Sequence, residues 1–159
     1  IRSALAQWEQ HRWGSVSFRD FCRYVLPYRV STEPVQPWRA QYLRQFAASV
    51  DTLRNPTFFE VGNALKREAR SWFTDTWGIE SRKDPLPTLG AQQLLFRRQG
   101  SCADMAALMA FALRAQGIPA AVDHSVFWGT STGSHMWAAI ISDSPSVPID
   151  MRKPGPCLF

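Results

Sequence analysis

Cysteine is scarce in this 159-residue chain, and long apolar runs are missing. The cysteines are Cys22, Cys102 and Cys157, which form no CxxC or CxxxC pair, so the sequence does not predict a structural zinc site and we expect no cofactor. Their odd number leaves at least one free thiol, even if one disulfide such as Cys22 to Cys157 forms. The longest stretch without Asp, Glu, Lys or Arg contains Gly129 and Gly133, a poor composition for hydrocarbon. We therefore expect no membrane span.

Internal repeats and low-complexity tracts are absent as well. Hydrophobic residues make up 45% of the chain and charged residues 19%. This composition excludes intrinsic disorder, collagen and coiled coils, and the length fits one domain that buries roughly 70% of its unfolded surface. The chain begins at Ile1 and ends shortly after Pro154 and Pro156, so we expect a fragment of a longer protein with further domains.

A clustered basic patch is also missing, although the formal net charge is +5. Fifteen of the 18 basic residues are Arg, yet they are scattered singly apart from the pair Arg97 and Arg98. Proteins that bind nucleic acid usually carry a basic stripe or cluster. We therefore expect no specific nucleic-acid partner and only a mild preference for acidic partners.

Glycine and proline divide the chain into a helical first two-thirds and a strand-like last third, which predicts an α+β fold. One helical face, with Phe18, Phe21, Cys22 and Val25, places Cys22 in the core. Helices are expected over Ser17–Leu26, Pro37–Leu53, Phe58–Trp77, Ala91–Arg98 and Met105–Gln116, and antiparallel strands over Ala120–Trp128, His135–Ser142 and Val147–Met151.

Cys102 follows a glycine turn and precedes a nearly apolar helix that ends at Gly117. Unpaired amides at a helix N-terminus stabilise a thiolate, so this position suits a nucleophile. A free cysteine is also a small apolar residue that packs in cores, and this alternative remains open.

His135 and Asp150 could serve such a thiol as base and orienting carboxylate. A hairpin turning between Ser142 and Asp143 would place them opposite each other on one face. Asp143 would then lie at the hairpin tip, so Asp150 is the preferred partner of His135.

These residues together resemble a known family. The segments GSCADMAALMAFALRAQGIPAAVD, GSHMWAAII and VPID are similar to the transglutaminase-like superfamily, relatives of papain-type cysteine enzymes. The resemblance covers about residues 89–150, and it implies a papain-like core with Cys102, His135 and Asp150 as catalytic residues. It divides the chain into a helical part, 1–80, and a catalytic core, 81–159.

The surroundings of the three residues give further candidates. Gln93 or Gln99 could supply a second oxyanion donor beside the Cys102 amide, although either could simply be solvated. Asp123, Trp128 and Trp137 could line a substrate cleft, with core packing equally open for the aromatic residues. A second similarity, over FCRYVLPYRVSTEPVQPWR, suggests a bacterial secreted or envelope location. Within it, Arg29, Glu33 and Arg39 are expected to form an internal ion pair rather than a ligand contact.

The expected reaction is acyl transfer from an amide through a thioester. The substrate would be a peptide, a protein or a glycopeptide. Hydrolysis is preferred to cross-linking because the sequence has no DxDxDG calcium loop. The alternative is a non-catalytic module on the same fold that binds a peptide or glycan or has a structural role.

Overall fold

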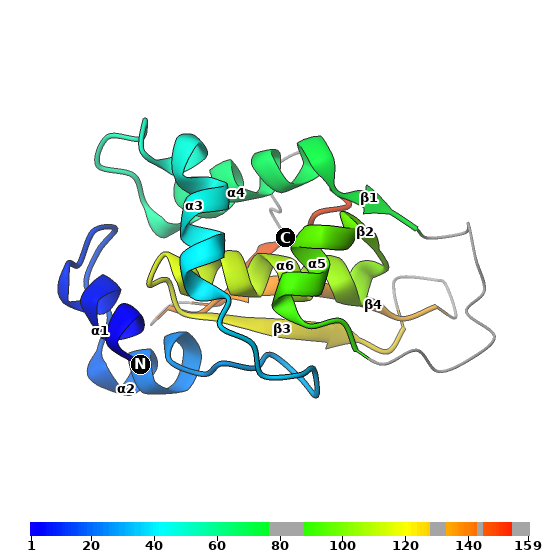
Figure 1. The fold of residues 1–159 in the computed structure, drawn as a ribbon, viewed down its shortest axis with the longest axis horizontal. Coiled ribbons are helices and arrows are strands. Elements are labelled where there is room, and N and C mark those ends of the chain that lie inside the picture. Colours follow the sequence, from blue (N-terminus) through cyan, green and yellow to red (C-terminus); the bar gives the residue numbers. More distant parts are fainter. Residues whose placement is uncertain (77–87, 128–132, 143–144, 154–159) are drawn as a thin grey trace.

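The computed structural model describes residues 1–76, 88–127, 133–142 and 145–153. The helices are α1 (Arg2–Glu9), α2 (Phe18–Asp20), the π-helix η1 (Phe21–Val25), α3 (Arg39–Val50), α4 (Phe58–Trp72), α5 (Ala91–Arg97) and α6 (Cys102–Ala115). The strands are β1 (Thr74–Asp75), β2 (Gln99–Gly100), β3 (Ala120–Ser125), β4 (His135–Ile140) and β5 (Val147–Ile149). Figure 1 shows these elements, which confirm the predicted α+β class.

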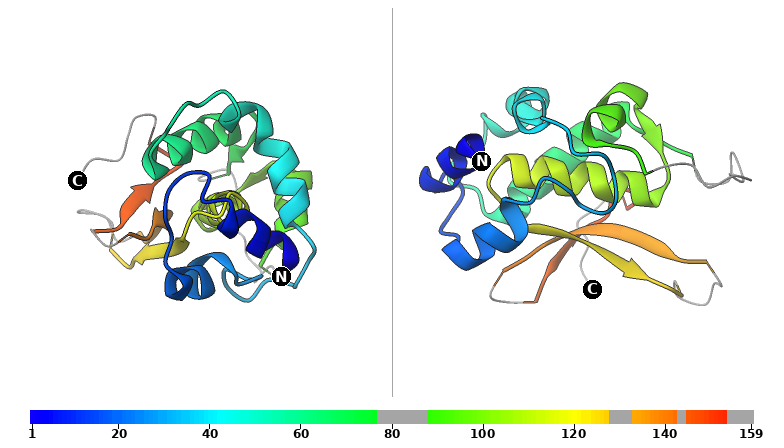
Figure 2. Two further views of the ribbon diagram at one scale, coloured as in Figure 1. Left: turned by 90° about the vertical axis from the view of Figure 1, so that its left-hand side faces the viewer. Right: turned by 60° about the horizontal axis from the view of Figure 1, so that its bottom comes forward.

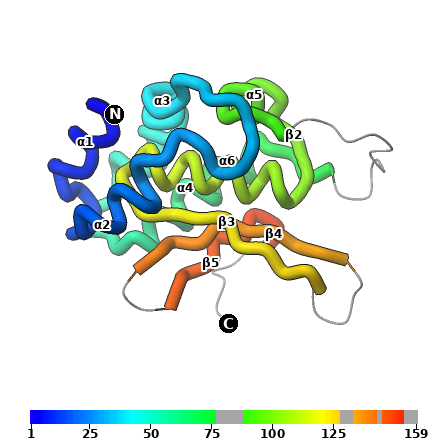
Figure 3. The backbone as a smooth tube through the Cα atoms, turned by 90° about the horizontal axis from the view of Figure 1, so that it is seen from below, coloured from blue at the N-terminus to red at the C-terminus, as the bar shows by residue number. Residues whose placement is uncertain are grey.

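Helix α6 lies at the centre of the molecule. Viewed along its axis, it is surrounded by the other helices on several sides and by the antiparallel sheet β3-β4-β5 on one side (Figure 2). Figure 3 shows the three strands side by side along α6. Most of the α6 side chains are buried, as the nearly apolar sequence predicts. The central core takes residues from the helices of the first half and from the sheet.

The ends of α6 follow from its flanking residues. Its last turn is followed by Gly117, which has φ +78°, and the Ile118 amide donates to the Leu113 carbonyl at 3.0 Å. A glycine adopts this left-handed conformation without steric cost, so the predicted end of the helix is confirmed. Its start differs, because the helix begins at Cys102 rather than at Met105.

Strands β4 and β5 pair with Ala138 opposite Ile149. Continued by one residue toward the start of β4, this register would place Asp150 opposite Trp137. The hairpin is therefore shifted by two residues from the predicted pairing of His135 with Asp150. A shift by an even number of residues leaves a side chain on the same face of the sheet, so the predicted common face of His135 and Asp150 is retained.

Cys22 is exposed, so its predicted core position is wrong. The reason is the π-helix, in which the Leu26 amide donates to the Phe21 carbonyl at 2.8 Å, five residues earlier. This wider turn changes the periodicity on which the prediction rested. Phe21 and Val25 remain buried, whereas Cys22 turns outward.

The predicted ion pair among Arg29, Glu33 and Arg39 is also wrong. The Glu33 carboxylate instead accepts hydrogen bonds from the amides of Val30 and Ser31, at 2.5 and 2.8 Å. Arg39 is buried and donates to backbone carbonyl groups: those of Val25, Leu26, Pro27 and Arg114. Desolvation by burial lowers the pKa of Arg39 to about 10.

Candidate active site

Cys102 is the first residue of α6 and is half-buried. The turn before it is fixed by Asp104, whose carboxylate accepts hydrogen bonds from the Ser101 amide at 2.8 Å and the Ser101 hydroxyl at 2.9 Å. Gly100 allows this carboxylate to lie against the backbone, because a Cβ at Gly100 would be 2.4 Å from Asp104 Cβ. The helix therefore starts at one defined place, with Cys102 at its positive end.

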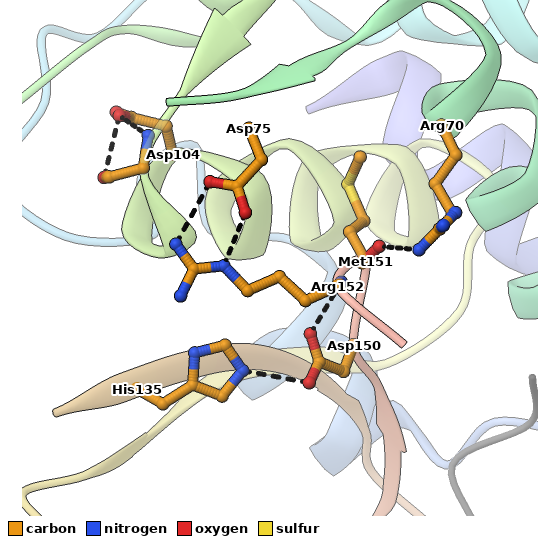
Figure 4. Close-up of polar contacts among 8 residues, drawn as sticks. Arg70, Asp75, Asp104, His135, Asp150, Met151 and Arg152 are labelled. Atoms are coloured by element: carbon orange, nitrogen blue, oxygen red, sulfur yellow. Dashed lines mark hydrogen bonds and ion pairs between the residues drawn. The ribbon is translucent and has the colours of Figure 1, made fainter. Parts of the chain in front are cut away.

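His135 and Asp150 form a buried pair. His135 begins β4 and Asp150 follows β5, and His135 Nε2 lies 2.9 Å from Asp150 Oδ2 (Figure 4). Both side chains are 5% exposed. When Nε2 carries the proton toward the carboxylate, the neutral ring has an unprotonated Nδ1. This arrangement gives a proton acceptor whose orientation is fixed by Asp150.

The thiol and the imidazole come from two elements that pack together, α6 and β4. In Figure 4 the Nδ1 side of His135 points away from Asp150, toward the side where Asp104 marks the first turn of α6. Within the described part of the chain, no hydrogen bond joins the Cys102 thiol to His135. Hydrogen bonds between catalytic groups often tighten only when substrate binds.

The cleft candidates differ in their surroundings. The Trp137 ring lies beside that of His135, with ring centroids 5.8 Å apart and planes inclined by 35°. Asp123 is directly across the β3–β4 ladder from Trp137 and is partly exposed. Trp128 lies outside the described residues. Trp137 and Asp123 therefore share one face of the sheet close to His135.

The two candidate oxyanion donors are exposed. The Gln93 side-chain carbonyl accepts a hydrogen bond from the Gly90 amide at 2.6 Å, so Gln93 caps the start of α5. Gln99 lies on β2, three residues before Cys102, and pairs in register with Thr74. Among the described residues, neither glutamine side chain makes a hydrogen bond to Cys102. The role of each stays a prediction.

Sequence reasoning missed three residues close to this site. Arg152 forms an ion pair with Asp75 of β1, and Arg70 of α4 donates a hydrogen bond to the Met151 carbonyl (Figure 4). Asp75 lies on β1, whereas the sequence predicts a helix over Phe58–Trp77, and no sequence pattern marks Arg152. No local motif could have found the ion pair, since its partners are 77 residues apart.

In residues 1–76, 88–127, 133–142 and 145–153, no cluster of three or more His, Cys, Asp or Glu side chains is arranged to hold a metal ion. In the same residues, no helix combines the length and apolar character needed to cross a bilayer.

Comparisons with solved structures support the fold. The periplasmic domain of TgpA from Pseudomonas aeruginosa is similar over 87% of this chain and 48% of its own, with a TM-score of 0.57 and 22% identity. A candidate cysteine protease from Cytophaga hutchinsonii is similar over 73% of this chain and 37% of its own, with a TM-score of 0.54 and 15% identity. The chain thus spans less than half the length of either structure.

No curated protein sequence matches the chain. The family model of the Transglutaminase-like superfamily, however, matches residues 44–151, which is more than half of the chain. The matched range contains Cys102, His135 and Asp150, and the described parts of it form the helices and the sheet from which the site is built. The chain belongs to the transglutaminase-like superfamily.

Proposed function

We propose that this chain is a cysteine-dependent enzyme that cleaves a peptide or related amide through a thioester on Cys102. The observation that carries the proposal is the buried hydrogen bond between His135 and Asp150. His135 begins β4, the strand that packs against the helix that Cys102 begins, and Asp150 follows the neighbouring strand β5. A buried imidazole with one nitrogen fixed by a carboxylate is suited to take and return a proton. Membership of the transglutaminase-like superfamily and the similarity to a candidate cysteine protease support the same proposed function.

The first half-reaction forms the thioester. His135 takes the proton of the Cys102 thiol, and the sulfur attacks the carbonyl carbon of the amide. The C–N bond then breaks, and the imidazolium gives its proton to the departing amine. The Cys102 backbone amide, at the start of α6, donates a hydrogen bond to the oxygen that becomes negative.

The second half-reaction removes the acyl group. His135 takes a proton from water, whose oxygen attacks the thioester carbonyl, and the C–S bond breaks. The sulfur recovers its proton from the imidazolium, so the enzyme returns to its starting state. We propose water as the first acceptor, and a primary amine in its place would give transfer instead of hydrolysis.

Trapping the acyl group on the protein tests this proposal. The chain is incubated with a panel of peptide amides and glycopeptides, quenched in acid, and mapped by mass spectrometry. We expect mass spectrometry to find an acyl adduct on Cys102. This adduct should disappear when hydrolysis of the thioester releases the carboxylic acid product. Added primary amine competes with water, and the ratio of acid to amide product identifies the acceptor.

Three variants and one control complete the experiment. Cys102→Ala should abolish the adduct and turnover, and His135→Ala should lose nearly as much. Asp150→Asn should cost less, because the amide oxygen still accepts a hydrogen bond from the imidazole. Cys22→Ala changes an exposed thiol and should keep full activity. If Cys102→Ala still turned over substrate, or if the parent chain bound a ligand without ever turning it over, the proposed enzyme function would be wrong and a binding module would be favoured.

A further inference from the structure

Two charged side chains outside the proposed triad join the sheet to the segment that leads into Cys102. Arg152 Nε donates to Asp75 Oδ2 at 2.8 Å, and Arg152 Nη2 donates to Asp75 Oδ1 at 3.1 Å (Figure 4). The two side chains are 22% and 35% exposed. Two parallel bonds between a guanidinium and a carboxylate fix the orientation of both groups, which a single contact would not do.

Arg152 lies two residues after Asp150, and Asp75 pairs with a residue that lies two positions before Cys102. The Arg152 amide donates to Asp150 Oδ1 at 2.9 Å, so both Asp150 oxygens are engaged, one by His135 and one by this amide. Asp75 lies on β1 and pairs in register with Gly100 of β2, two residues before Cys102. The ion pair therefore connects the turn that carries Asp150 to β1, and through the β1–β2 pairing to the segment that leads into Cys102.

A second contact fixes the same turn from another side. Arg70 of α4 donates a hydrogen bond to the Met151 carbonyl, and the Lys153 amide donates to the Asp150 carbonyl at 3.3 Å. The backbone around Asp150 is thus held by α4, while Arg152 extends from it to β1 (Figure 4). With the backbone held, the Arg152 side chain defines the distance between the turn and the β1–β2 pair.

We propose that Asp75 and Arg152 are positioning residues, which place Asp150, and through it His135, relative to Cys102. The inference rests on the proposed function. Neither side chain contacts the reacting atoms in that mechanism. Their loss should therefore slow the chemistry at Cys102 and loosen the His135 hydrogen bond while the fold persists.

The test compares this ion pair with a second one in the same chain. Asp75→Asn, Arg152→Gln and the double variant remove the first pair. Asp51→Asn and Arg12→Gln remove the control pair, which lies at 2.6 Å on the surface with side chains 56% and 38% exposed. Two rates are measured in each variant: alkylation of Cys102 by iodoacetamide, and exchange of the His135 Nε2 proton with water by NMR.

We expect each single change at Asp75 or Arg152 to slow alkylation about tenfold, since a displacement below 1 Å at a reacting group has effects of this order. Exchange of the Nε2 proton should become faster. The double variant should lose no more than either single variant, because both changes remove one interaction. Arg152→Lys should recover only part of the rate, because an ammonium cannot form the two-bond contact. The control variants should keep both parent rates.

The proposal would be overturned if folded Asp75→Asn and Arg152→Gln alkylated Cys102 and exchanged the His135 proton as fast as the parent chain. It would also be overturned if the losses of the two single variants added up in the double variant. If Cys102 of the parent chain were inert to iodoacetamide, the proposed function would fail, whereas proton exchange at His135 would still decide the positioning role. Should Arg152→Gln fail to fold, Asp75→Asn, which keeps the shape of the side chain, decides the outcome.

Discussion

Gly100→Ala tests the idea that the backbone before Cys102 must lie directly against Asp104. A Cβ at Gly100 would be 2.4 Å from Asp104 Cβ, 2.8 Å from its Cγ and 2.7 Å from its Oδ2. Ordinary contacts of a Cβ begin near 3.4 Å, so the overlap is about 1 Å. Because Asp104 Cβ is bonded directly to the α6 backbone, side-chain rotation cannot relieve the overlap. The first turn of the helix must move.

The expected cost has two parts. Overpacking costs about 1–3 kcal/mol. Displacement of Asp104 also breaks its hydrogen bonds to the Ser101 amide and hydroxyl, and the loss of such a cap costs about 1 kcal/mol. We therefore expect the free energy of unfolding to fall by about 2–4 kcal/mol. A movement of Cys102 by about 1 Å should reduce its reactivity about 100-fold.

Gly90→Ala is the matched control. A Cβ there would also meet an atom at 2.4 Å, but that atom is Gln36 Oε1, at the end of a flexible side chain. Movement of Gln36 breaks its 2.9 Å hydrogen bond from the Gln92 amide, so we expect a loss of about 1 kcal/mol and no change at Cys102. Urea unfolding and iodoacetamide alkylation measure both effects. Equal stability and equal Cys102 reactivity in the two variants would refute the reasoning.

Two further predictions concern charges away from the site. Arg39→Met should lower the free energy of unfolding by about 2 kcal/mol in urea titrations, because buried carbonyls lose their donor, whereas Arg12→Met on the surface should change it by less than about 0.5 kcal/mol. An Arg39→Met variant with the same free energy of unfolding as the parent chain would contradict this role of the buried arginine. Hydrogen bonds from the Thr57 amide and hydroxyl lower the pKa of Glu60 from 4.5. The stability that this carboxylate provides is complete above pH 4.5 and is lost as the pH falls through the lower folded-state value. Glu60→Gln should make the fall of the free energy of unfolding with decreasing pH less steep. An unchanged pH dependence would contradict the lowered pKa of Glu60 as its cause.

Local patterns in the sequence predicted much of the fold. The central helix was found because its residues are nearly apolar all round and because Gly117 ends it. The fold class and the strand order of the hairpins followed from proline, glycine and β-branched residues. Patterns of this kind succeed where the decisive interactions lie within a few residues of one another.

The failures have physical causes as well. The outward turn of Cys22 depends on a π-helix, which a period of 3.6 residues does not predict. The ion pair between Asp75 and Arg152 depends on tertiary packing across 77 residues. The hairpin register could be predicted only to within two residues, because the turn that sets it has no defining two-residue motif.

We propose that Cys102 is an activated nucleophile served by His135 and Asp150. Accessibility alone predicts the opposite order of thiol reactivity, because Cys22 is exposed whereas Cys102 is half-buried. A Cys157→Ser background leaves these two thiols to compete for limiting iodoacetamide at neutral pH. Peptide mapping then gives the ratio of their labels.

We expect Cys102 to be labelled first, because His135 is proposed to take the thiol proton when the sulfur reacts. His135→Ala should reverse the order and leave Cys22 as the faster thiol. Faster labelling of Cys22 in the parent chain, or a preference for Cys102 that survives His135→Ala, would contradict the assignment of Cys102 as the nucleophile.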